Sequence, residues 1–175
     1  MVTLVPSHAT TINSQLGDVP SQARVIVVDI SDIPSLAVDL TDDKIQELWE
    51  QPIQKVITEL QDAHSSGCKR IVVVTPLIGM SGAAGYSAQA AVAEAARIVV
   101  KSAARQWGKD GIVVNAVALE SAAYGIDESV AGPVSIAPRA MTNEVSAKGI
   151  VQWLCSEAAG DVTGQTFIVD GGSWM

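Results

Sequence analysis

Few side chains in this sequence are suited to chemistry, and most of them stand too far apart to form a site. There are two cysteines, Cys68 and Cys155, and two histidines, His8 and His64. None of the four lies at the spacing of metal ligands, and paired motifs such as CxxC or HExxH are absent, so we expect no metal site. We interpret the histidines as loop and helix-end residues without a catalytic role. The isolated cysteines indicate reduced thiols and a cytoplasmic location.

The composition indicates one ordinary globular domain. The 175 residues are 48% hydrophobic and 17% charged, with a mean hydropathy of +0.29. The formal net charge is -8 and no basic run exceeds the pair Lys69 and Arg70, so we expect neither nucleic acid nor an anionic membrane as a partner. Apolar runs fall far short of the ~20 residues of a membrane span. The amino terminus lacks the basic start and apolar stretch of a signal peptide.

Short β-branched runs alternate with longer stretches that suit helices. Strands are predicted most strongly at 24–29 (RVIVVD) and 70–75 (RIVVVT), with others at 111–117 and 166–169 and a first one at 2–5. Their hydrophobicity is continuous rather than alternating, which indicates a sheet covered on both faces. The prediction is an α/β fold: a single domain over residues 1–175, built as a three-layer sandwich with a mostly parallel sheet of about five strands.

Three helices are predicted between these strands. The first runs from Asp42 to about Ala63 with Thr41 as its N-cap, and Pro52 must kink or divide it. The second, 83–107, carries small and apolar residues over more of its circumference than a singly buried helix does, which leaves one face for a partner. The third is expected at 142–157. Between the fourth strand and this helix, 119–141 is expected to be an irregular surface loop, which in an α/β enzyme would cover a substrate.

Two long segments together resemble a known family. The stretch RIVVVTPLIGMSGAAGYSAQAAVAEAARIVVKSAARQWGKDGIVVNAVA looks like the catalytic strand, active-site helix and following strand of a short-chain dehydrogenase/reductase. The stretch WLCSEAAGDVTGQTFIVDGG looks like that family's carboxyl-terminal signature. The likeness extends from about residue 42 to 172. It implies a Rossmann-like fold and descent from NAD(P)-dependent alcohol dehydrogenases.

The same likeness implies that the family's catalytic groups have been lost. In the family a tyrosine acts as acid or base, a lysine four residues later lowers its pKa and holds the nicotinamide ribose, a serine fixes the substrate oxygen, and an asparagine supports a proton relay. Tyr86 matches the tyrosine, but the lysine position is Ala90. The serine falls on Pro76 and the asparagine on Pro52. We therefore expect no catalytic residue, with Tyr86 as a remnant.

The spacing between Pro76 and Tyr86 leaves one alternative open. It is about three residues shorter than in the family, so Thr75 or Ser81 could supply the missing hydroxyl. Thr75 is next to the expected position, and consecutive side chains of a strand point to opposite faces, which argues against it. The loss of the lysine does not depend on this spacing.

The resemblance also implies that this chain binds no cofactor. The family's first strand leads into a glycine-rich turn that holds the pyrophosphate, whereas here the run at 2–5 is followed by PSHATTINSQLGD, and Gly17 is the first glycine. Roughly eighteen residues separate this run from Arg24, so there is no room for the family's second and third strands. The family's NNAG-like turn reads VVDIS, and Leu119 and Glu120 replace a Pro-Gly pair. We expect a domain that lacks part of the dinucleotide-binding half.

These expectations lead to a hypothesis of a non-catalytic subunit. It would stabilise and shape a full-length catalytic relative that binds NAD and oxidises an alcohol or a hydroxyacyl-CoA of the β-oxidation type, in a heterotetramer. The family packs the second predicted helix and its predecessor in a four-helix subunit interface. The interface candidates here are Ala91, Val92, Ala95, Val99, Ala103, Trp107 and Trp174. The alternatives are an NAD-independent enzyme that uses Tyr86, and a module that binds a small molecule in the vacated cleft.

Overall fold

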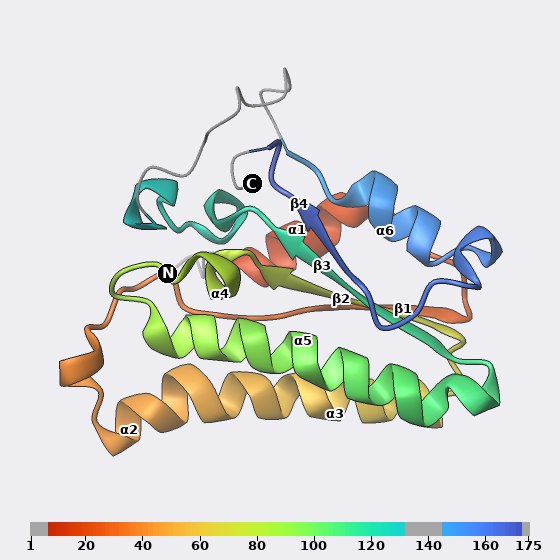
Figure 1. Ribbon diagram of the computed structural model, residues 1–175, viewed down its shortest axis with the longest axis horizontal. Helices are drawn as coiled ribbons and strands as arrows, with labels where there is room; N and C mark the ends of the chain where they lie inside the picture. The colour runs from red at the N-terminus through yellow and green to blue at the C-terminus, as the bar shows by residue number, and fades with distance from the viewer. Residues whose placement is uncertain (1–6, 132–144, 173–175) are drawn as a thin grey trace, which may run out of the picture.

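A four-stranded parallel sheet lies between two helical layers (Figure 1). The computed structural model describes residues 7–131 and 145–172. The strands are β1 (Ala23–Val27), β2 (Arg70–Pro76), β3 (Val113–Leu119) and β4 (Thr166–Val169), paired in that order. The α/β three-layer, Rossmann-like architecture is confirmed. The expected strand at 2–5 lies outside the described residues.

The helices divide between the two faces of this sheet. α3 (Gln51–Ser65) and α5 (Ser87–Trp107) cover one face, and α1 (His8–Leu16) and α6 (Lys148–Leu154) cover the other (Figure 1). The shorter elements are α2 (Asp42–Ile45), α4 (Ile78–Ser81), the π-helical turn η2 (Gln46–Glu50) and the 3₁₀ turns η1 (Ala37–Asp39), η3 (Gly108–Asp110), η4 (Ser121–Tyr124), η5 (Glu128–Ala131) and η6 (Glu157–Ala159). Because α3 and α5 each connect parallel strands, they run in the same direction.

The first predicted helix is continuous, but its winding changes just before Pro52. The Thr41 side chain accepts a hydrogen bond from the Lys44 N–H, as expected of an N-cap, and α2 passes through η2 into α3. Pro52 lies in the first turn of α3, directly after the π-helical turn in which the Gln51 N–H donates to the Gln46 carbonyl. α3 continues two residues beyond the predicted end and stops before Gly67.

The other two helices begin later than predicted. α5 starts at Ser87 rather than 83, because the preceding chain turns through Gly82 and Gly85, both with positive φ (69° and 80°). α6 covers 148–154 of the predicted 142–157; residues 145–147 precede the helix, and 142–144 lie outside the described residues. The loop expected at 119–141 holds the turns η4 and η5, and its part from 132 lies outside the described residues.

The central strands β2 and β3 form the core. Val72, Val73 and Val74 of β2 are all fully buried, as continuous hydrophobicity predicts for a sheet covered on both faces. Asn115 of β3 is buried too, and its side chain donates to the Val162 carbonyl (2.7 Å) and accepts from the Gln165 N–H (3.0 Å), which fixes the loop that leads into β4.

No helix in the part of the chain that the structure describes is both long and apolar enough to cross a membrane. Within the same residues, no three histidine, cysteine, aspartate or glutamate side chains gather as a metal site would require.

A pair of substitutions in α3 tests the packing of this helix on the sheet. Leu60 is 2% exposed, so Leu60→Ala should lower the free energy of unfolding by about 2–5 kcal/mol through lost burial and a residual cavity. Thr58→Ala, on the exposed side of the same helix, should change it by less than about 0.5 kcal/mol. Urea unfolding followed by circular dichroism measures both, and equal effects would contradict this packing.

Candidate functional site

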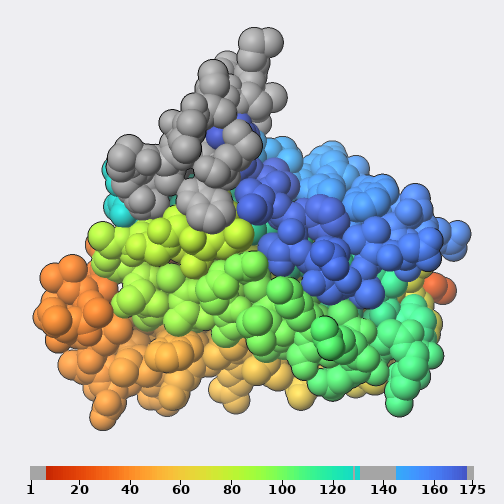
Figure 2. Space-filling model, viewed as in Figure 1, coloured from red at the N-terminus to blue at the C-terminus, as the bar shows by residue number. Residues whose placement is uncertain are grey.

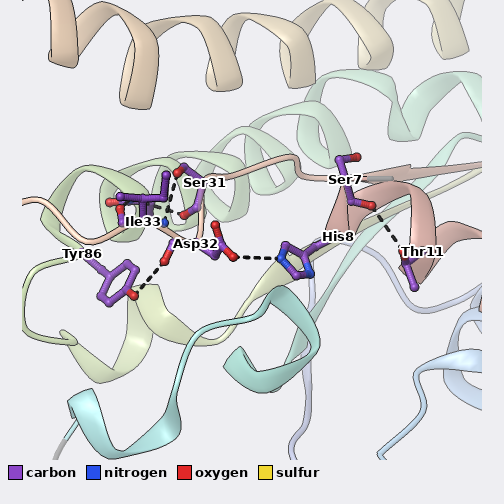
Figure 3. Close-up of polar contacts among 8 residues, drawn as sticks. Ser7, His8, Thr11, Ser31, Asp32, Ile33 and Tyr86 are labelled. Carbon is purple, nitrogen blue, oxygen red and sulfur yellow. Dashed lines mark hydrogen bonds and ion pairs between the residues drawn. The ribbon is translucent and has the colours of Figure 1, made fainter. Parts of the chain in front are cut away.

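The residues of interest meet at the edge of the sheet where the parallel strands end. Open α/β sheets bind their ligands at this edge. Tyr86 precedes α5, residues 31–35 follow β1, and His8 begins α1 (Figure 3). Segments from three distant parts of the sequence thus come together around Tyr86.

The Tyr86 hydroxyl is already engaged. It donates a hydrogen bond to the backbone carbonyl of Asp32 (2.9 Å), and the residue is 6% exposed (Figure 3). Burial raises the pKa of Tyr86 above its ordinary value of 10.0, and the negative charges of Asp32 and Asp127 raise it further. The phenol is therefore held in its neutral form, whereas acid–base work near neutral pH needs a lowered pKa.

The lysine position offers no compensation for these negative charges. Ala90 lies one helical turn after Tyr86, where its N–H donates to the Tyr86 carbonyl (2.8 Å). Its methyl side chain carries no charge, and both charged groups that shift the Tyr86 pKa are carboxylates. A lysine or arginine here would lower that pKa, and alanine leaves it raised.

The residues expected at the family's serine and asparagine positions have no side-chain hydroxyl or amide. Pro76 is the buried last residue of β2, paired in register with Leu119, and Pro52 lies in the first turn of α3. The Thr75 hydroxyl is fully buried and makes no hydrogen bond to any described residue, and Ser81 donates to the Ile78 carbonyl (3.3 Å). Neither alternative hydroxyl bonds to Tyr86.

Residues 31–35, which we name the strap, occupy the hydrogen-bonding groups around Tyr86. The Gln89 amide donates to the carbonyls of Ser31 (3.3 Å) and Ile33 (3.0 Å), while the Ser35 N–H donates to the Gly85 carbonyl (2.6 Å). Together with the Tyr86 bond, these contacts hold the strap against the start of α5. Sequence reasoning missed the strap because its backbone carbonyls accept these bonds, and carbonyls leave no signature in residue type.

His8 lies at the end of a helix, as predicted, and its side chain reaches this site. Its Nε2 lies 3.2 Å from Oδ2 of Asp32, and the two side chains are 40% and 46% exposed (Figure 3). Gly125 lies against the ring with φ 73°; a Cβ there would come within 2.6 Å of Nε2. His64, by contrast, lies in the last turn of α3 as predicted, stacked against Trp107 at 4.7 Å between ring centroids.

The interface candidates on α5 differ in how much surface they keep. Val92 is completely buried in the chain's own core, so it has no surface for a partner, and the expectation for it is wrong. Ala103 is 5% exposed. Ala91, Ala95, Val99 and Trp107 are half-buried and keep surface. Trp174 lies outside the described residues.

Sequence comparison places residues 53–173, well over half of the chain, in a family model described as Enoyl-(Acyl carrier protein) reductase. A tropinone reductase homologue of Arabidopsis thaliana is 34% identical over 116 residues, 62% of this chain and 43% of that protein. The 3-oxoacyl-[acyl-carrier-protein] reductase of Synechocystis sp. is 32% identical over 127 residues, 69% of this chain and 50% of that protein. The chain thus spans about half the length of these relatives.

Solved structures agree on the fold. A 3-oxoacyl (acyl-carrier-protein) reductase from Agrobacterium tumefaciens C58, with NADP bound, superposes with a TM-score of 0.66 at 20% identity, covering 87% of this chain and 65% of that one. YwfH, an NADPH-dependent reductase involved in bacilysin biosynthesis, gives 0.66 at 19% identity, covering 85% and 66%. The chain belongs to the short-chain dehydrogenase/reductase family of oxidoreductases, and the architecture is that of the family's Rossmann-like domain.

The raised pKa of Tyr86 predicts the course of an alkaline titration. The chain has two tyrosines, and burial also raises the pKa of Tyr124, whose hydroxyl donates to the Val74 carbonyl (3.2 Å). Since both are shifted upward, the folded protein should show no tyrosinate absorbance step at or below pH ~10, and the step should appear there on unfolding in urea. Tyr86→Phe serves as the control that assigns the first step. A tyrosine that titrates below pH 9 while folded would overturn this account.

Proposed function

We propose that this chain is a non-catalytic subunit of a heteromeric NAD-dependent short-chain dehydrogenase. A full-length relative binds NAD and transfers the hydride, and this chain stabilises that relative and shapes its substrate entrance. The observation that carries the proposal is the hydrogen bond from the Tyr86 hydroxyl to the Asp32 carbonyl, with alanine at the lysine position.

The proton chemistry of the family supports this assignment. The reaction needs a tyrosine free to bond the substrate oxygen and able to exchange a proton near neutral pH. Here the donor is used within the fold, and both neighbouring charges oppose the phenolate. With Pro76 at the serine position, a side chain that would orient the substrate oxygen is missing as well.

The residues at the amino end of α1 support the proposal that this chain binds no cofactor. Backbone N–H groups at such a helix end bind a pyrophosphate when glycines let it approach. In this chain the Ser7 hydroxyl accepts from the Thr10 N–H (3.2 Å), and His8 occupies the first turn against Asp32. Ala90 also removes the lysine that would hold the nicotinamide ribose. NAD is then bound by the partner.

The names of the relatives support an acyl-type substrate. Two of the reductases compared act on acyl groups attached to a carrier protein, according to their names. We propose an alcohol or hydroxyacyl-CoA of the β-oxidation type. The proposed assembly is a heterotetramer with two chains of each kind. The pattern resembles the inactive subunit of the heteromeric 2-[hydroxy(phenyl)methyl]succinyl-CoA dehydrogenase of anaerobic toluene degradation.

One observation favours a second candidate function, an NAD-independent enzyme that uses Tyr86. The half-exposed His8 and Asp32 pair lies beside Tyr86 at the ligand-binding edge of the sheet. A histidine oriented by a carboxylate is a common general base. If this pair acts in a reaction, His8→Ala should abolish an activity that the isolated chain shows without NAD.

Cofactor binding and assembly can be measured directly. Calorimetric titration of the isolated chain with NADH should show no binding, with the full-length relative as the positive control. Micromolar NADH affinity of the isolated chain would contradict the proposal.

Native mass spectrometry after co-expression with that relative should show a complex with two copies of each chain. If the two proteins remain separate, the proposed assembly is wrong.

A tyrosine substitution in each chain shows which chain of the complex carries the catalysis. Tyr86→Phe should leave the turnover of the assembled complex unchanged within a factor of two, because this hydroxyl bonds only to the strap among the described residues. The matched control is the same change at the catalytic tyrosine of the full-length relative, which should lower kcat by at least 100-fold. A comparable loss from Tyr86→Phe would favour the second candidate.

A further inference from the structure

A hollow of about 720 Å³ lies at the edge of the sheet where the parallel strands begin, and we name it the amino-edge hollow. Its walls come from the turn before β1, the start of β2, the turn before β3 and the end of α6. The segments around residues 21, 70, 111 and 156 meet at the right-hand end of the molecule (Figure 2). β2 rises about 20 Å between Arg70 and Pro76, so this hollow is far from the carboxyl edge that carries Tyr86.

Backbone hydrogen bonds hold the frame of the amino-edge hollow. The N–H groups of Lys69 and Arg70 both donate to the Gln22 carbonyl (2.8 and 3.3 Å), which ties the start of β2 to the turn before β1. The Val113 N–H donates to the Lys69 carbonyl (3.0 Å), which ties the start of β3 to the same place. Because the frame is already ordered, a ligand would bind there with little loss of backbone entropy.

Two positively charged side chains line this hollow. Arg70 is half-buried, and its Nε and Nη1 donate to the carbonyls of Ser156 (3.4 Å) and Lys69 (3.0 Å). Nζ of Lys69 donates to the Asp110 carbonyl (3.0 Å). Since a carbonyl carries no net charge, these contacts hold the two cations in place without neutralising them.

Neither cation has a carboxylate partner in the described part of the chain. No ion pair there involves Lys69 or Arg70, and no described residue accepts a hydrogen bond from Nη2 of Arg70. A guanidinium has five N–H groups and an ammonium has three, so both side chains keep donors for an anion. Acidic side chains outnumber basic ones in this chain by 19 to 11, so the missing carboxylate partner does not reflect a shortage of carboxylates.

The other titratable side chains around the hollow leave its charge positive. Burial raises the pKa of the Cys155 thiol to about 11, so this thiol is neutral at physiological pH and adds no negative charge. Glu157 is exposed and contributes one carboxylate to the lining. With two positive charges and one negative charge, the described lining has a net charge of +1.

We propose that the amino-edge hollow binds the phosphate group of a small phosphorylated organic molecule, with Arg70 and Lys69 as its main donors. The planar fork of a guanidinium matches two oxygens of a phosphate, and the Ser21 hydroxyl in the lining supplies a further donor. The volume of about 720 Å³ falls within the range of sites for small molecules, so the organic part has room beside the phosphate. This inference does not rest on the proposed function, because the hollow shares no lining residue with the Tyr86 site.

A nuclear magnetic resonance titration of the isolated, isotope-labelled chain tests this inference. The probes are glycerol 3-phosphate, inorganic phosphate and glycerol, compared at neutral pH and constant ionic strength. Glycerol 3-phosphate should shift the amide signals of Gln22, Gly111 and Ser156, which all line the hollow. It should bind more tightly than inorganic phosphate, because its organic part also contacts the walls, and glycerol alone should cause no shift.

A matched pair of lysine variants separates this hollow from a general effect of charge. Lys69→Ala should weaken glycerol 3-phosphate binding at least about fivefold, because it removes one of the two cations. Lys101→Ala removes the same charge from a different hollow, lined by residues 163–165, and should change the affinity less than about twofold. Arg70→Lys keeps the charge but loses the planar fork, and should weaken binding about tenfold. Glu157→Gln should strengthen binding, because it removes the carboxylate from the lining.

Other outcomes would overturn the inference. The absence of amide shifts at about 10 mM glycerol 3-phosphate excludes the site. Equal losses from Lys69→Ala and Lys101→Ala would mean that binding follows net charge, and equal affinities for glycerol 3-phosphate and inorganic phosphate would mean an adventitious ion only. Arg70 also joins the end of α6 to β2 through its bond to the Ser156 carbonyl. If that is its only role, Arg70→Lys lowers the melting temperature while phosphate binding stays intact, and the proposal is wrong.

Discussion

The hydrogen bond between the Tyr86 hydroxyl and the Asp32 carbonyl is the interaction on which the functional interpretation depends. It is one neutral hydrogen bond, worth about 1 kcal/mol of stability, so its energetic role is small. Its chemical effect is larger, because it occupies the donor that an active family member directs at its substrate. Burial and the negative charges of Asp32 and Asp127 raise the pKa of this phenol, and Ala90 supplies no positive charge to lower it. The strap that accepts the bond is in turn held by Gln89, so the arrangement is part of the fold.

The proposed non-catalytic role requires the chain to act through its surfaces. The layer of α3 and α5 presents Ile57 and Ile98 to solvent. The family's α/β architecture supplies two parallel helices side by side, and the sequence of this chain determines their charges.

The sequence predicted the parts of this molecule that depend on local patterns. Continuous apolar runs predicted β2 and β4, the latter with its observed bounds, because a strand buried on both faces needs no alternation. Pro52 and Thr41 marked helix boundaries through their own backbone and side-chain chemistry. The prediction for Val92 was wrong because an alanine-rich helix presents no clear apolar stripe, so the pattern does not indicate which side faces the sheet.

What the sequence by itself determined is therefore the α/β class and the family, and it led to the expectation that Pro52, Pro76 and Ala90 stand at the family's catalytic positions. Each of these follows from residue type and order. Only the tertiary structure decided that His8 meets Asp32, and that Tyr86 and Gln89 donate to the carbonyls of the strap. These contacts join residues 24 to 58 positions apart, and the strap contributes backbone carbonyls that every residue type possesses. No pattern of side chains along the chain can specify such a pairing before the sheet brings its strand ends together.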